Sequence, residues 1–200
     1  MIKRLACLAV LVGSLGVSGC APTYTLVRSG PQPVAKDAFT VSPSQNWNRI
    51  PKTANVIAIE ESWTKNGPML DSISFVGGLA EGQALIVQKK KDDQQVPPFR
   101  SDMSPNDLVS MTESYYRVRG GVTVFNVTGV EPAQFLGSNG VKFDFDYVGS
   151  DSFPKKGRCF MAVVGGKLYL MKLEGAASHY FASSSTEFDS MAKSAMLAKR

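Results

Sequence analysis

The sequence predicts an α+β domain in which an antiparallel β-sheet is flanked by a middle helix and a C-terminal helix. Apolar and polar residues alternate strictly over residues 141–147, which is typical of a strand with one buried face. A capped helical pattern occupies residues 105–119, and a second apolar helical stripe lies near residues 185–197. Several strand patterns combined with these two helices indicate the α+β class.

The chain begins with the parts of a secretory signal peptide. Residues 1–4 carry two positive charges, residues 5–15 form an uncharged apolar run, and small residues follow at Gly16, Ser18 and Gly19. A transmembrane helix needs roughly 20 apolar residues, so this run is too short to span a bilayer. We therefore expect residues 1–19 to be a signal peptide that is removed.

Val17, Ser18, Gly19 and Cys20 resemble, position by position, the lipobox of bacterial lipoproteins. The resemblance implies lipidation of the Cys20 sulfur, cleavage between Gly19 and Cys20, and further acylation, for example with palmitate. Two or more acyl chains give durable membrane attachment. Ala21 is not the Asp that commonly retains such proteins in the inner membrane, which implies the outer membrane, facing the periplasm. The alternative is an ordinary signal peptide with Cys20 as a chance residue or an oxidised thiol.

A polar segment follows, with Pro22, Gly30, Pro31 and Pro33 and no sustained periodicity. We expect residues 20–38 to be the lipidated cysteine and a flexible tether. A coil of about 18 residues would hold the domain roughly 20–25 Å from the bilayer on average. The single α+β domain is then expected over residues 39–200.

The net charge argues against a nucleic-acid partner, and the cysteine content argues against an internal disulfide. Removal of residues 1–19 lowers the formal net charge of +5 by two, and no basic stripe with interleaved aromatic residues is present, so we expect no nucleic-acid partner. Cys7 leaves with the signal peptide and Cys20 would be lipidated, so Cys159 has no partner for an internal disulfide. Cys159 lies in an apolar run, which favours a buried, inert thiol over a nucleophile.

The first half of the domain predicts a hairpin. Residues 55–63 form one strand, Lys65 to Pro68 form a turn with Asn-Gly at its centre, and residues 69–76 form the returning strand. The most polar run, residues 89–95, is interpreted as a solvated loop. The alternative is a basic finger that touches anionic lipid headgroups or an acidic partner.

The middle helix has clear start and stop signals. Ser104 can cap its N-terminus, Pro105 suits the first helical position, and Gly120-Gly121 ends it. Its core-facing positions are Leu108, Met111, Tyr115 and Val118.

Strand patterns fill the region after this helix. Pro132 is expected to interrupt the first of them, residues 138–140 are expected to form a turn, and Gly165-Gly166 a two-residue hairpin turn. The expected strands are residues 122–130, 134–137, 141–147, 158–164 and 167–173.

Ser184 and Glu187 have the spacing of a capping box and predict the start of the C-terminal helix. Its apolar stripe consists of Phe188, Met191, Ala192 and Ala195.

The order of these elements over residues 39–198 is similar to the PsbP/Mog-type fold, and in particular to DcrB-like envelope lipoproteins. The resemblance implies a role in binding or assembly, generally without catalytic residues. It rests on a pattern of elements and transfers no site residue.

No catalytic constellation is found in the sequence. His179 is the only histidine and is interpreted as a structural or surface residue rather than a base. One histidine and one free cysteine cannot make a usual zinc site. Asp144, Asp146 and Asp151 lack the spacing of a calcium loop, so we expect no metal and no cofactor.

The first functional hypothesis is a non-enzymatic envelope lipoprotein whose periplasmic domain binds or stabilises another envelope component. We expect this partner to be an envelope protein. Trp63, Tyr115 and Tyr116 are candidate contacts, with core packing as the alternative. The second hypothesis is a binding module for a small apolar or lipid-like ligand between sheet and helix. The third hypothesis is a hydrolase whose catalytic residues do not match a recognisable motif.

Overall fold

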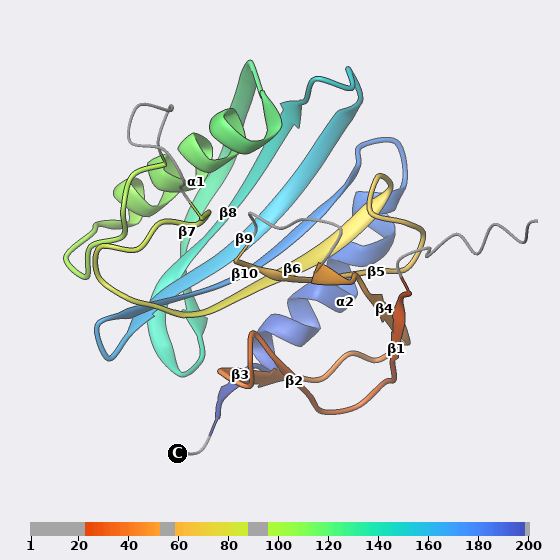
Figure 1. Ribbon diagram of the computed structural model, residues 1–200, viewed down its shortest axis with the longest axis horizontal. Helices are drawn as coiled ribbons and strands as arrows, with labels where there is room; N and C mark the ends of the chain where they lie inside the picture. Colours follow the sequence, from red (N-terminus) through yellow and green to blue (C-terminus); the bar gives the residue numbers. More distant parts are fainter. Residues whose placement is uncertain (1–22, 53–58, 88–95, 199–200) are drawn as a thin grey trace, which may run out of the picture.

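The computed structural model describes residues 23–52, 59–87 and 96–198, and the predicted signal peptide, Cys20 and the run 89–95 lie outside these ranges. Figure 1 shows one large antiparallel sheet with a helix on each side. Its strand order is β1-β4-β5-β6-β10-β9-β8-β7, and a second sheet has the order β11-β3-β2. The predicted α+β class, with an antiparallel sheet flanked by two helices, is confirmed.

The bounds of the elements are as follows. The large sheet consists of β1 (Thr25–Val27), β4 (Trp47–Arg49), β5 (Glu61–Thr64), β6 (Asp71–Leu79), β7 (Val124–Phe135), β8 (Ser138–Val148), β9 (Pro154–Val164) and β10 (Lys167–Ala176). The small sheet consists of β2 (Gln32–Val34), β3 (Phe39–Val41) and β11 (Met196–Leu197). The helices are α1 (Pro105–Gly120) and α2 (Tyr180–Lys193). Within the described ranges, no helix is long and apolar enough to cross a bilayer.

Two hydrophobic cores lie on opposite faces of the large sheet. Cys159 and Met161 of β9 point into the core under α1, whereas Phe160 and Ala162 point into the core that α2 and the small sheet cover. Because side chains alternate along a strand, the central strands supply both cores at once. The large sheet is therefore the middle layer of the domain.

The predicted middle helix is confirmed. The Ser104 hydroxyl accepts a hydrogen bond from the Asp107 backbone N–H, and the Asp107 carboxylate accepts one from the Ser104 N–H, which completes a capping box. Gly121 ends the helix with a left-handed φ of 56°.

Helix α2 differs from the prediction at both ends. It begins at Tyr180, and His179 at its N-cap makes no side-chain cap hydrogen bond. The Glu187 carboxylate does not cap the helix but accepts hydrogen bonds from the backbone N–H of Gln45 and from the Trp47 indole, at 3.0 and 3.3 Å. The helix ends at Lys193, because the chain then pairs with β3 as β11.

Strand β7 is continuous through Pro132, so the predicted break is wrong. Strand β7 is the edge of the sheet and pairs only on its β8 side in the described structure, and such edge strands tolerate proline. The hairpin turn lies at Leu136 and Gly137, two residues before the predicted one, and both have positive φ. The predicted turn at Gly165-Gly166 and the alternation of β8 are confirmed.

The predicted tether is too long. Strands β1 and β2 lie within it, and Val27 and Val34 are buried in the core under α2. Proline and glycine suggested a coil here, whereas Pro33 lies on β2, an edge strand that pairs with β3 in the small sheet. The folded domain therefore begins near residue 25 instead of residue 39.

Close contact between β8 and β9 depends on Gly157. It pairs with Phe145, and a Cβ atom added to Gly157 would overlap the Phe145 ring. That ring is buried and packed against Tyr116, Phe125 and Tyr147. The ring thus occupies the room that a side chain would need.

We expect Gly157→Ala to lower the free energy of unfolding by about 1–3 kcal/mol, the usual range for overpacking. Urea unfolding followed by fluorescence would measure the change. Gly129→Ala is the matched control, because a Cβ there meets no atom within 4 Å. Equal stabilities of the two variants would contradict the packing argument.

Candidate functional site

A cavity of about 480 Å³ lies on the α1 face of the large sheet, beyond the C-terminal end of α1. The end of α1 contributes Tyr115, Tyr116 and Arg119 to its wall. A small-side-chain wall comes from β5 and β6, with Ser62, Ser72 and Ser74. Since the serines fill less space than the apolar residues farther along the sheet, this end of the sheet surface stays hollow.

The floor of the cavity contains a buried ion cluster. The Lys172 ammonium lies 3.5 Å from a Glu60 carboxylate oxygen and 3.2 Å from one of Glu174. The side chains of Lys172 and Glu60 are only 2% and 5% exposed, so these charges have little access to water. Buried charges are tolerated when they are paired, and here one cation bridges two anions.

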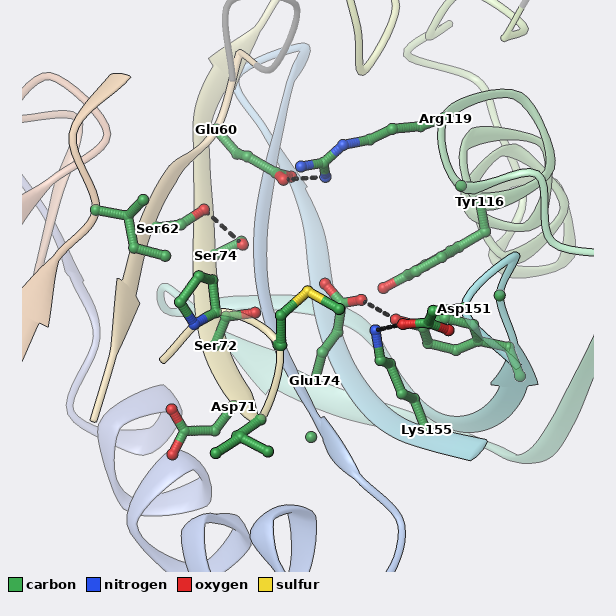
Figure 2. Close-up of a pocket in the computed structure, with 18 of the residues that line it drawn as sticks. Glu60, Ser62, Asp71, Ser72, Ser74, Tyr116, Arg119, Asp151, Lys155 and Glu174 are labelled. Carbon is green, nitrogen blue, oxygen red and sulfur yellow. Dashed lines mark hydrogen bonds and ion pairs between the residues drawn. The ribbon is translucent and has the colours of Figure 1, made fainter. Parts of the chain in front are cut away.

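Aromatic side chains complete the cluster. The Tyr115 hydroxyl donates a 2.8 Å hydrogen bond to Glu60, and the Tyr147 hydroxyl donates a 2.6 Å hydrogen bond to Glu174. The Lys172 ammonium also lies over the rings of Tyr115 and Tyr116, 4.4 and 4.9 Å from their centroids. Arg119 adds a second cation by pairing with Glu60 at 2.5 Å (Figure 2).

The environment fixes the protonation of these groups. Burial alone would raise the pKa of the Glu174 carboxyl, but the Lys172 ammonium and the Tyr147 hydroxyl more than offset it and hold this pKa below its usual value. Burial and the Glu174 charge raise the pKa of Tyr147 and Tyr116. The carboxylate is therefore ionised and both phenols are protonated at neutral pH.

The Tyr116 hydroxyl is the one polar group of the cluster left without a hydrogen bond of ordinary geometry. Tyr116 is only 4% exposed, and Figure 2 shows its hydroxyl directed at the cavity beside Glu174. A hydroxyl can donate one hydrogen bond and accept two. The hydroxyl is itself sealed from solvent, so it forms part of the buried polar layer beside Glu174.

One side of the cavity mouth is apolar. Tyr24, Met69 and Leu70 lie there with substantial exposure, and we call these three residues the apolar rim. The turn that carries Met69 and Leu70 is held by the buried Asp71, whose carboxylate accepts hydrogen bonds from the Thr64 hydroxyl and the backbone N–H of Lys65, at 2.7 and 2.9 Å. The turn thus keeps two apolar side chains at the surface.

The candidate residues from the sequence fall in different places. Cys159 is fully buried, and burial raises the pKa of its thiol, so the predicted inert thiol is confirmed. His179 is exposed at the start of α2 and does not line the cavity, which confirms a surface residue. Trp63 is core, whereas Tyr115 and Tyr116 are buried but face the cavity.

The three aspartates considered as calcium ligands are not brought together. Asp144 pairs with Arg158 at 2.7 Å, and Asp151 pairs with Lys155 at 2.9 Å. Asp146 accepts a hydrogen bond from Asn126. Within the described ranges, no group of three or more His, Cys, Asp or Glu side chains could hold a metal ion.

Glu60, Lys172 and Glu174 were not predicted from the sequence as site residues. A signal was present at Lys172, a charged residue within the apolar strand 167–173 and in step with the core residues Leu168 and Leu170. A charge at a core position predicts a buried partner, although sequence spacing alone does not identify Glu60, which lies more than a hundred residues away.

Comparison with solved structures identifies the fold. The solution structure of cyanobacterial PsbP (CyanoP) from Synechocystis sp. PCC 6803 matches with a TM-score of 0.55 and 14% identity, covering 93% of this chain and 98% of that one. The Ran-binding protein Mog1p of Saccharomyces cerevisiae matches with a TM-score of 0.51 and 10% identity, covering 90% and 97%. The chain has a PsbP/Mog1-like fold.

A third structure, LpqN of Mycobacterium tuberculosis, described as involved in cell envelope biogenesis, matches with a TM-score of 0.44 and 10% identity, covering 91% of this chain and 88% of that one. No protein-family model matches the chain. The search among curated proteins returned no match.

We expect Lys172→Met to lower the free energy of unfolding by about 3–5 kcal/mol, because Glu60 and Glu174 lose the cation that they share. Chemical denaturation at neutral pH would measure this loss. Lys142→Met is the control on the same sheet. Its partner Glu131 is 61% exposed, and we expect a change of at most about 1 kcal/mol there. A similar loss in both variants would exclude a special role for the buried cluster.

The pKa of Glu174 also predicts a pH dependence. A pKa lower in the folded than in the unfolded state gives a stabilisation that is present above the ordinary value of 4.5 and is lost as the pH falls below it. We therefore expect the free energy of unfolding of Glu174→Gln to fall less between neutral pH and pH ~3.5 than that of the unchanged protein. Parallel slopes for the two proteins would refute this assignment.

Proposed function

We propose that the protein is a non-enzymatic binding domain of the bacterial cell envelope, lipid-anchored through Cys20 to the outer membrane and facing the periplasm. It binds another envelope component at the cavity described above. The observation that carries the proposal is an open cavity above buried carboxylates that are already paired with Lys172 and Arg119.

The chemistry of the cavity supports binding over catalysis. Glu60 and Glu174 are engaged by cations and phenols, and the pKa of Glu174 is lowered, which does not suit a general base near neutral pH. The Ser62 and Ser74 hydroxyls hydrogen-bond to each other at 2.8 Å. Among the described residues that line the cavity, there is neither a histidine nor a cysteine to activate a nucleophile.

The anchor is supported by the sequence of residues 17–20, which follows an apolar run of the length expected for a signal peptide. The first strand of the described residues begins at Thr25, so a chain that is cut before Cys20 keeps every strand that the structure describes.

The cavity also favours the second candidate, a small lipid-like ligand. Its volume lies within the roughly 300–1,000 Å³ typical of small-molecule sites. An ionic floor below an apolar rim suits an amphiphile with a polar head better than a wholly apolar molecule, because apolar groups alone would cover the partly exposed charges of Arg119 and Glu174. If the partner is instead an envelope protein, one of its side chains occupies the cavity in place of the polar head.

A photoreactive amino acid at Ser150, in the cavity mouth, is expected to capture the occupant in living cells. Ser110 on α1 is the matched control, since it is an exposed serine that does not line the cavity. Mass spectrometry of the adduct from position 150 distinguishes an envelope protein from a small lipid-like molecule. Equal adducts at both positions, or none at position 150, would overturn the proposed site.

The same preparation tests the anchor. The intact mass of the mature protein is expected to include acyl chains on Cys20, and Cys20→Ser is expected to lose them together with membrane association. An unmodified Cys20 in the mature chain would refute the lipoprotein assignment.

A further inference from the structure

The folded domain starts very close to the residue that would carry the lipid. Tyr24 lies at the mouth of the cavity, and Thr25 pairs with Arg49 at the start of β1. Only residues 21–23 separate Cys20 from Tyr24. Even a fully extended chain covers at most about 14 Å over these four steps. The covalent connection therefore fixes an upper limit on how far the cavity mouth can be from the lipidated cysteine.

The apolar rim is the surface that this short connection brings to the membrane. Tyr24, Met69 and Leu70 are 43%, 60% and 37% exposed. The backbone fixes the turn in place, since the Leu70 N–H donates to Gly67 and the Leu70 carbonyl accepts from Ala176. Apolar side chains that a rigid turn presents to water next to a lipid attachment point suit the boundary between headgroups and acyl chains.

We infer that the apolar rim docks on the bilayer that holds Cys20, so that the cavity opens onto the lipid headgroups. This inference rests on the proposed lipidation of Cys20. The ring of Tyr24 combines an apolar face with a polar hydroxyl, as is typical of aromatic residues at a membrane interface. Met69 and Leu70 enter the acyl boundary beside it, and a ligand reaches Glu174 and Tyr116 from the headgroup layer.

The bilayer is the occupant that best fits the rim. A partner protein or a second copy would need to lie between the domain and its own anchor, within the limit of about 14 Å that the chain allows. That is close to the diameter of a single α-helix with its side chains, about 10–12 Å, and leaves no room for a folded domain. The opposite end of the molecule, with β3 and β11, is far from the turn between β5 and β6 (Figure 1).

The test uses two single variants, Met69→Cys and Met196→Cys, each labelled with the fluorophore nitrobenzoxadiazole. Met69 and Met196 are matched, because they are 60% and 64% exposed and lie at different ends of the domain. In the lipidated protein only the introduced thiol reacts, since Cys7 has left with the signal peptide, the Cys20 sulfur carries lipid and Cys159 is fully buried. The full-length lipidated protein is reconstituted into vesicles of phosphatidylethanolamine and phosphatidylglycerol, with or without brominated acyl chains.

We expect brominated chains to quench the probe at position 69 at least about threefold more than the probe at position 196, as immersion at the acyl boundary requires. Adding Leu70→Asp to the Met69→Cys protein is expected to remove most of this quenching. Equal quenching at both positions would overturn the inference. A blue-shifted emission at position 69 without bromine quenching would also overturn it, because a protein surface would then cover the rim.

Flotation of the vesicles separates the two proposals. Protein that does not float with the vesicles has no lipid anchor, and the proposed function fails. Protein that floats while the probe at position 69 stays in water keeps its anchor, and the docking inference alone fails.

Discussion

The charge of Lys172 is buried in the core face of the large sheet, and the groups at this end of the sheet are arranged to neutralise it. Its ammonium continues the row of core side chains that begins with Leu168 and Leu170, where water cannot neutralise it. Glu60, Glu174 and the phenols of α1 and β8 gather around it because an unpaired buried charge is too unfavourable to persist. Along β10 the apolar core side chains are therefore followed by buried ion pairs, and Glu60 and Glu174 of these pairs line the cavity.

Local patterns predicted the elements whose signals are local. The capping box of α1 and the alternation of β8 lie within short stretches of chain, and both appear in the structure as expected. Where the structure differs from these predictions, contacts between residues far apart in the sequence are the reason. Glu187 has the spacing of a capping residue but is used by Gln45 and Trp47, and Pro132 is accepted because β7 is an edge strand. Neither fact can be read from neighbouring residues.

The candidate site was less predictable than the fold, for the same physical reason. The residues of its ion cluster come from four separate regions of the chain. The sequence pointed to two of the aromatic residues, Tyr115 and Tyr116, and the charge of Lys172 in an apolar strand was the signal for the cluster itself. The chain before residue 39 showed the opposite error. Prolines and glycines suggested a coil, whereas the burial of Val27 and Val34 makes β1 and β2 part of the domain. Strands β1 and β2 are stabilised by pairing with β4 and β3 and by burial of these two valines, which local sequence patterns do not reveal.

Strands β9 and β10 contribute side chains to both hydrophobic cores. This arrangement limits which of their residues can be substituted during evolution. A strand with one face in water can vary at every second residue, but Phe160 and Met161 are both buried and point in opposite directions. Neutral drift must therefore accumulate at the margins, as along β7, where most side chains are exposed. Such a domain can diverge widely in its edges and loops while the centre of its sheet keeps its shape.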